Sequence, residues 1–130
     1  MRGQRGYIGF LRTESSCPLC SLSEADSWLF DDHAVALPHD PPAGFGHAIV
    51  ASRRHVALFF SLDAFEQKML WEAVGAVKRR VAEGLNVERF HIGFVDFEHG
   101  DGHAYIHVIP RGVDEEFSLP EGVQWIADPD

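Results

Sequence analysis

The chain has 130 residues, and its 11 Lys and Arg against 20 Asp and Glu give a formal net charge of −9 at pH 7. This length is enough for one compact domain with its own core. Hydrophobic residues make up 45% and charged residues 24%, which is typical of a globular protein and argues against disorder. The surplus of negative charge repels phosphate backbones, so it argues against nucleic acid as the main ligand.

No targeting or membrane segment is evident along the chain. No apolar run approaches the roughly 20 residues that span a bilayer, and residues 1–12 lack the apolar stretch of a signal peptide. We therefore expect a cytoplasmic protein with no membrane partner. Its two cysteines, Cys17 and Cys20, form a C-x-x-C pair. In a reducing compartment such a pair is more often metal-binding or redox-active than a structural disulfide.

The first half of the chain predicts short strands joined by turns. Residues 27–30 and 34–37, which are mostly apolar, flank Asp31-Asp32-His33, a pattern that predicts a hairpin. The Pro- and Gly-rich residues 39–46 predict a loop, and residues 47–51 predict a further strand.

The second half predicts one long helix followed by two strands. Residues 62–84 are expected to be helical with Ser61 as the N-cap, because apolar side chains recur at helical spacing: Phe65, Met69, Leu70, Val74, Val77 and Val81. Residues 90–96 and 103–109 predict strands. Short connections and an excess of strands over helices favour an antiparallel α+β arrangement.

Residues 103–109 alternate polar rings with small apolar side chains. A strand with this period of two places His103, Tyr105 and His107 on one face. Ala104, Ile106 and Val108 fall on the other. Taken alone, the polar face indicates either a solvated strand edge or a functional site.

The segment from Gly102 to Arg111 resembles the signature of the histidine-triad (HIT) family, His-x-His-x-His followed by two apolar residues and Pro-Arg. Further segments resemble the family in the same order: Cys17-Pro-Leu-Cys20, Gly46-His47-Ala48-Ile49-Val50, Arg53-Arg54-His55-Val56 and Gly122-Val123-Gln124-Trp125-Ile126. The resemblance covers residues 17–126. It implies a single domain over residues 1–130, with 1–16 as an N-terminal extension. The implied fold is α+β, an antiparallel sheet of about five strands with one long helix and a short N-terminal helix or turn.

The resemblance assigns the catalytic positions to Tyr105 and His107. In the family, the central histidine attacks the α-phosphorus of a nucleotide, and its neighbours position the phosphate and help to protonate the leaving group. Here the central position holds Tyr105. A phenol has a pKa near 10 and is mostly un-ionised at neutral pH, and an aryl phosphodiester has no protonatable nitrogen to help it leave. The usual two-step mechanism is therefore not expected.

The resemblance also suggests residues that contact the substrate. The family position that holds the ribose falls on His39, or on Asp40 after a shift of one residue. His47 either lines the nucleotide pocket or caps a strand, and Arg111 either neutralises phosphate or pairs with an acid. The phosphate loop of the family is replaced by residues 97–102, about three residues shorter by alignment to the family pattern, with acids where an anion would lie.

Zinc-containing members of the family imply a metal site in this chain. Their ligands carry over to four residues here: Cys17, Cys20, His55 and His103. Two thiolates and two imidazoles form a closed tetrahedral set, so the zinc would stabilise the fold rather than catalyse. The alternative is two buried thiols and two unrelated histidines.

Three functions remain open from the sequence. The first is an enzyme of nucleotide phosphate or phosphoramidate chemistry that works with the changed triad. The second is a non-catalytic, zinc-stabilised domain that binds a nucleotide-like or other small anionic ligand. The third is a structural or partner-binding protein with a vestigial pocket. The family resemblance further implies a homodimer.

Overall fold

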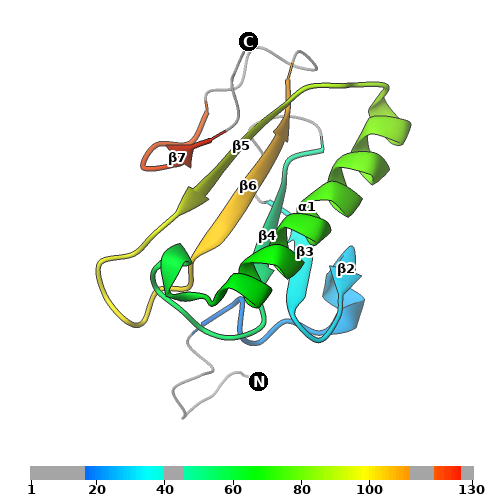
Figure 1. Cartoon of the computed structure of the whole chain (residues 1–130). Coiled ribbons are helices and arrows are strands. Elements are labelled where there is room, and N and C mark those ends of the chain that lie inside the picture. Colours follow the sequence, from blue (N-terminus) through cyan, green and yellow to red (C-terminus); the bar gives the residue numbers. More distant parts are fainter. Residues whose placement is uncertain (1–16, 40–45, 112–118, 127–130) are drawn as a thin grey trace, which may run out of the picture.

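A six-stranded antiparallel sheet with a long helix against one face forms the fold (Figure 1). The computed structural model describes residues 17–39, 46–111 and 119–126. The strand order is β2-β3-β4-β6-β5-β7. The strands are β2 (Leu29–Phe30), β3 (Ala34–Pro38), β4 (Ala48–Ser52), β5 (Phe90–Val95), β6 (Tyr105–Pro110) and β7 (Gln124–Trp125). The helices are α1 (Ala64–Leu85) and the short 3-10 helices η2 (Glu24–Asp26) and η3 (Phe59–Ser61). The expected α+β class is confirmed.

The predicted hairpin forms at the start of the sheet. Strands β2 and β3 pair antiparallel with Leu29 opposite Ala36. In the turn, Asp31 Oδ1 accepts hydrogen bonds from the backbone N–H groups of His33 and Ala34, each at 2.8 Å. An aspartate that bonds its own backbone two and three residues ahead stabilises such a turn.

Helix α1 begins later than the apolar pattern predicts. Its N-cap is Asp63 rather than Ser61, and it forms a capping box with Glu66. Asp63 Oδ1 accepts from the N–H of Glu66 at 2.8 Å, and Glu66 Oε1 accepts from the N–H of Asp63 at 3.0 Å. Ser61 instead ends η3, because the chain makes a separate 3-10 turn before the helix. No helix in the described ranges is long and apolar enough to cross a bilayer.

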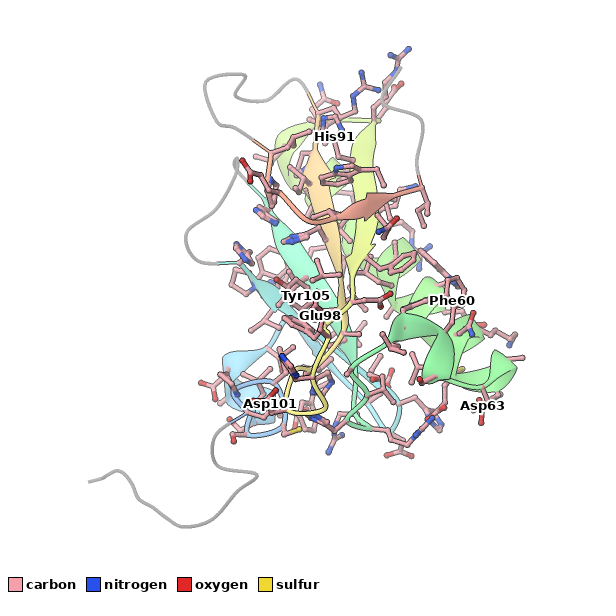
Figure 2. All side chains as sticks on the ribbon, turned by 90° about the vertical axis from the view of Figure 1, so that its left-hand side faces the viewer. Phe60, Asp63, His91, Glu98, Asp101 and Tyr105 are labelled. Carbon is pink, nitrogen blue, oxygen red and sulfur yellow. The ribbon has the colours of Figure 1, made fainter. Side chains whose placement is uncertain are left out.

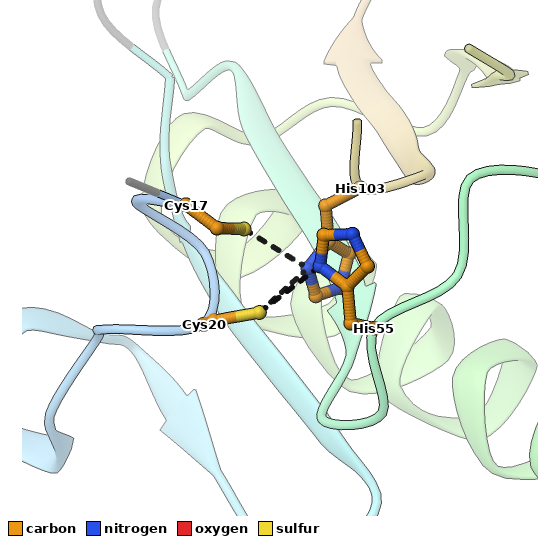
Figure 3. Close-up of side chains that lie close together, drawn as sticks. All are labelled: Cys17, Cys20, His55 and His103. Carbon is orange, nitrogen blue, oxygen red and sulfur yellow. Dashed lines mark hydrogen bonds between the residues drawn. The ribbon is translucent and has the colours of Figure 1, made fainter. Parts of the chain in front are cut away.

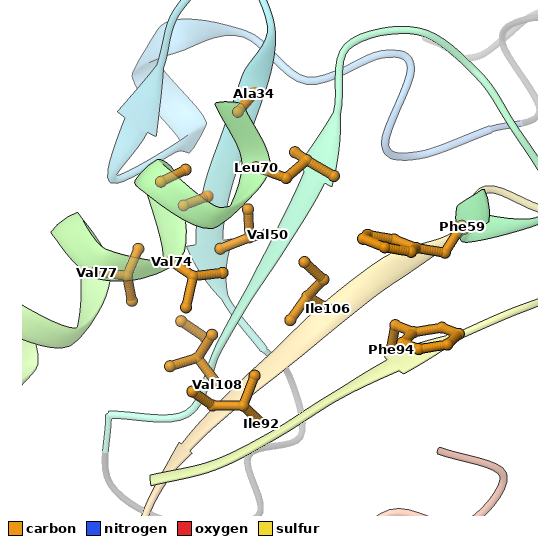
Figure 4. Close-up of a cluster of buried hydrophobic side chains, with 14 of the residues drawn as sticks. Ala34, Val50, Phe59, Leu70, Val74, Val77, Ile92, Phe94, Ile106 and Val108 are labelled. Atoms are coloured by element: carbon orange, nitrogen blue, oxygen red, sulfur yellow. The ribbon is translucent and has the colours of Figure 1, made fainter. Parts of the chain in front are cut away.

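The hydrophobic core lies between α1 and one face of the sheet (Figure 4). The helix contributes Leu70, Ala73, Val74, Val77 and Val81, all buried. The sheet contributes alternate residues of its central strands: Ala34, Ala36, Ala48, Val50, Ile92, Phe94, Ile106 and Val108. Phe65, expected on the apolar side of the helix, is 54% exposed. It lies in the first turn of α1, outside the core cluster, and its ring makes a T-shaped contact with His33.

The face of the sheet away from α1 carries the polar rings. Tyr105 and His107 alternate along β6 with the core residues Ile106 and Val108, as the period of two predicts. His103 is the exception, because it precedes β6 instead of lying in it. The sheet has six strands among the described residues, where about five were expected. The additional strand, β7, is two exposed residues long and gives no alternating signal in the sequence.

Candidate functional site

Four side chains from three segments converge on one point (Figure 3). Cys17 and Cys20 lie in a tight turn that is closed by a bond from the N–H of Cys20 to the carbonyl of Cys17 at 3.2 Å. His55 follows β4 and His103 precedes β6. One ligand atom from each residue lies within 4.8 Å of all the others. The Sγ atom of Cys20 is 3.1 Å from His55 Nδ1 and 3.5 Å from His103 Nδ1, and Cys17 Sγ is 3.5 Å from His103 Nδ1.

Backbone carbonyls orient both imidazoles of this cluster. His103 Nε2 donates to the carbonyl of Ser52 at 2.9 Å, and His55 Nε2 donates to the carbonyl of Gly100 at 2.9 Å. Both bonds leave Nδ1 as the lone-pair nitrogen that faces the thiols, the arrangement that supports metal-ligating histidines. Burial lowers the pKa of His103, the hydrogen bond to Ser52 partly opposes this, and the nearby His55 adds to the lowering, so that the neutral, ligating form is favoured.

The cluster has the dimensions of a tetrahedral metal site. Metal–sulfur and metal–nitrogen bonds of ordinary zinc length place S and N about 3.5 Å apart across a tetrahedral edge. The two contacts at 3.5 Å to His103 match that edge. Cys17 and Cys20 are thiols rather than a disulfide. The residues predicted from the family pattern are therefore brought together in a Cys2His2 cluster positioned to bind a metal.

A second cluster of three imidazoles lies on the same face of the sheet. His47 Nε2 and His107 Nδ1 are 2.8 Å apart, and His39 stacks on His47 with ring centroids 4.4 Å apart. The edge of His39 also meets His107 at 5.2 Å. His47 and His107 are each 2% exposed. The register that pairs Ile49 of β4 with His107 of β6 sets this contact, because it places His47 beside the second half of β6.

Burial keeps the two inner imidazoles neutral. It lowers the pKa of His47 to about 3, with further contributions from His39 and His107. It also lowers the pKa of His107 to about 4, with a further contribution from His39. A charged imidazole would lose hydration in this buried setting, which favours the neutral form. At neutral pH one ring of the pair donates its N–H to the lone pair of the other.

A cavity of about 450 Å³ opens beside Tyr105 and reaches the metal cluster. One wall is apolar, formed by Leu37, Pro38, Ile49 and Phe97. Leu37 and Ile49 face each other across the β3–β4 ladder. Sequence reasoning missed these four residues as site residues. The sequence did hold a signal for two of them. Leu37 and Ile49 alternate with the core residues of their strands, so they point to the opposite face of the sheet, where the cavity lies.

The rest of the cavity wall joins the two clusters. Cys17 and His103 line it from the metal side, and His39 lines it from the imidazole side. Tyr105, at the start of β6, and Asp101, in the preceding loop, also line it. Both residues are labelled in Figure 2. The Tyr105 ring lies 5.1 Å from that of His107, measured between centroids. Burial raises the pKa of Tyr105, so its phenol keeps its proton at neutral pH.

Two of the four predicted substrate residues are not found at this cavity: one lies away from it, and the other lies outside the described residues. Arg111 follows the last residue of β6, the end opposite Tyr105, and its N–H bonds the carbonyl of Arg89 at 2.9 Å. Its charge contributes to the lowered pKa of His91, after burial. Asp40 lies outside the described residues. Of the four, His39 lines the cavity and His47 supports it through the ring stack.

The fold and the Cys2His2 cluster together define an α+β domain with a metal-binding motif, and solved structures share that fold. The sequence itself matches no protein-family model and no curated protein. A Zn-bound histidine triad family protein from Mycobacterium smegmatis is 18% identical with a TM-score of 0.68, covering 90% of this chain and 87% of that one. A diadenosine triphosphate hydrolase from Plasmodium falciparum is 17% identical with a TM-score of 0.64, covering 75% and 68%.

The C. elegans NitFhit protein shares the fold as part of a longer chain. It is 22% identical with a TM-score of 0.63 over 72% of this chain, which spans 23% of the NitFhit chain. The fold is therefore that of histidine-triad proteins. The resemblance that the motifs indicated is confirmed at the level of the fold.

Proposed function

We propose that this protein is a zinc-stabilised HIT-fold domain that binds a nucleotide or nucleotide-like small molecule beside Tyr105 and forms no covalent nucleotidyl intermediate. The observation that carries the proposal is the position of Tyr105. Its half-buried phenol lines the cavity, and the sequence resemblance assigns this position to the family's histidine nucleophile. A cavity of about 450 Å³ falls within the size range of small-molecule sites.

The geometry favours a hydrogen-bond donor over a nucleophile at Tyr105. Burial raises the pKa of its phenol, and the ring faces the neutral imidazole of His107. A phenol becomes nucleophilic when a base or cation lowers its pKa, and burial here has the opposite effect. A protonated phenol donates well to a phosphate, carbonyl or ring nitrogen of a ligand.

Zinc is the metal we propose for the Cys2His2 cluster. Two thiolates and two imidazoles suit its preference for sulfur and nitrogen in a tetrahedral set. The four protein donors complete that set, so the metal would tie the N-terminal turn to the sheet and supply no reactive water. One of the solved structures with this fold is described as Zn-bound.

Hydrolysis by a water molecule activated by His107 is the second candidate. The hydrogen bond of 2.8 Å between His47 and His107 favours it, because it fixes the orientation of the His107 ring. A pKa of about 4, however, makes His107 a weak base at neutral pH. We therefore place binding ahead of catalysis. Roles for Asp40 and Arg111 in ribose and phosphate recognition stay predictions.

One experiment separates the two candidates. AMP release from adenosine 5′-phosphoramidate is compared among wild type, Tyr105→His and His107→Ala, with AMP binding measured by calorimetry. The proposal expects saturable AMP binding by wild type, no turnover, and turnover in Tyr105→His. Wild-type turnover that is lost in His107→Ala would establish hydrolysis instead. Absence of turnover in wild type, together with absence of binding of both AMP and adenosine, would indicate a vestigial pocket.

The hydroxyl of Tyr105 has its own matched variant. Tyr105→Phe keeps the ring and removes one hydrogen bond, so we expect AMP affinity to fall about two- to ten-fold. Unchanged affinity would contradict contact between the hydroxyl and the ligand.

A cytoplasmic homodimer completes the proposal. The two thiols of the metal cluster need a reducing compartment to stay available for a metal. The oligomeric state can be measured by light scattering coupled to gel filtration.

A further inference from the structure

We infer that the cavity selects ligands with a nucleoside-like aromatic group and little negative charge, and that Asp101 determines this specificity. The inference rests on the proposed function, because it names the ligand class of the same cavity. A nucleoside, or a nucleoside bearing a neutral substituent, is the class that the wall accepts best. Nucleoside mono- and diphosphates are disfavoured.

The apolar wall supplies the surface for an aromatic ring. Leu37, Pro38 and Ile49 present aliphatic carbon, and Phe97 presents an aromatic ring that also lies 6.2 Å from Tyr105. Removing apolar surface from water contributes about 25 cal/mol per Å² of area buried. A base can bury such area on this wall, whereas a phosphate group cannot.

The charges on the wall disfavour an anion. Outside the metal cluster, and with histidine counted as neutral, Asp101 is the one formally charged side chain among the described residues that line the cavity, and neither Lys nor Arg is among them. Its carboxylate is exposed and therefore hydrated at the cavity edge. A phosphate entering there would meet a like charge, which raises the free energy of binding.

Among the described residues, the metal cluster, the two buried imidazoles and Arg111 do not offset this negative charge. The Cys2His2 cluster sums to zero with a divalent metal, two thiolates and two neutral imidazoles. Burial holds His47 and His107 in their neutral forms. Arg111 lies at the opposite end of β6 from Tyr105. The whole chain carries a net charge of −9, which adds a long-range term of the same sign.

The test compares adenosine, AMP and ADP by calorimetry at pH 7.5, at low and at physiological ionic strength. We expect adenosine to bind tightest and ADP weakest, with the gap widening at low salt because screening is weaker there. Asp101→Asn should tighten AMP about three- to ten-fold and leave adenosine unchanged. Asp101→Lys should tighten AMP further.

The matched control is Glu98→Gln, which removes one negative charge from an exposed position in the same loop outside the described cavity wall. It should leave the preference between adenosine and AMP close to that of wild type. AMP binding as tightly as adenosine in wild type, or an equal gain in the two variants, would overturn the inference while the proposed function stands. Failure of all three compounds to bind would overturn the proposed function and the inference with it.

Discussion

His47 Nε2 lies 2.8 Å from His107 Nδ1, so one of these two buried imidazoles donates a hydrogen bond to the other. Burial favours the neutral form of both rings, since each is 2% exposed and lies against His39. Protonation of either ring would place a cation in a site that withholds most of its hydration. The pair therefore links the stability of the fold to pH.

Stability should fall between pH 6.5 and pH 4.5. The pKa values of about 3 for His47 and about 4 for His107 lie below the value near 6.5 expected in the unfolded chain. The unfolded state thus binds more protons in this window, and the free energy of unfolding decreases as the pH is lowered. Each ring should contribute on the order of 2 kcal/mol to that decrease.

Urea unfolding of wild type and His107→Gln across this pH range measures the effect. The variant should show a decrease that is smaller by about 2 kcal/mol, because one titrating ring is gone. His99→Gln, at an exposed position, is the control for loss of an imidazole. Equal pH dependence in wild type and His107→Gln would contradict the prediction.

Removal of the metal should destabilise the fold. Zinc that binds the Cys2His2 cluster in the native state alone would stabilise it by about 4 kcal/mol when free zinc is about 1,000 times its Kd. Thermal unfolding with and without a chelator, together with metal analysis of the purified protein, checks this. We expect one zinc per chain, and a large loss of metal in Cys17→Ser but not in His99→Gln. Less than one zinc per chain in wild type purified without chelator would contradict the zinc assignment.

The same metal should shape the ligand cavity. Cys17 and His103 belong to the cluster and also line the cavity. Without a metal, the turn of residues 17–20 is no longer bonded through the metal to the sheet, and the cavity wall that Cys17 and His103 form is expected to become less ordered. Adenosine affinity should therefore fall at least several-fold after chelation and return when zinc is restored. Identical affinity in both forms would show that the wall holds its shape without the metal.

Replacing Gly102 by alanine should displace a side chain of the cavity wall. A Cβ placed on Gly102 would overlap Cβ and Cγ of Phe97, which lines the apolar wall. Gly102→Ala should cost about 1–3 kcal/mol of stability and weaken adenosine binding, because the Phe97 ring must move. Gly100→Ala meets nothing within 4 Å and is the control in the same loop. Comparable stability of the two variants would contradict the predicted overlap.

The start of α1 gives a test of the capping box. Asp63→Ala should cost about 1 kcal/mol, because it leaves the N–H of Glu66 without its acceptor at the helix end. Ser61→Ala should have little effect, since Ser61 belongs to the preceding 3-10 helix. Urea unfolding of both variants compares the costs. A larger cost for Ser61→Ala would favour the N-cap expected from the apolar pattern.

Local patterns in the sequence were sufficient for most of the fold. Alternation along β6 predicted which side chains face the core, because a strand reverses its side-chain direction at every residue. Helical spacing predicted the buried face of α1 from Leu70 onward. Both signals are properties of neighbouring residues. Two-residue β7 has no such signal, since its pairing with β5 depends on contacts distant in the chain.

The metal cluster was predictable only because the spacing of its residues resembles a known family. Nothing local to Cys17, His55 or His103 indicates that they meet, since their separation along the chain is 86 residues between the first and last. The structure supplies the physical reason. The carbonyls of Ser52 and Gly100 hold both Nδ1 atoms toward the thiols.

The sequence by itself determined the long helix, the strands other than β7, and the core faces of β6 and of α1 from Leu70 onward, and its resemblance to a known family indicated the four candidate metal ligands. The tertiary structure alone decided the stack of His39 on His47, the neutral pair of His47 and His107, and the cavity wall on which Asp101 carries the charge. These features arise because the strand order places β4 beside β6 and because His103, just before β6, meets the turn of Cys17 and Cys20. They depend on register and burial, which are set by the folded chain as a whole.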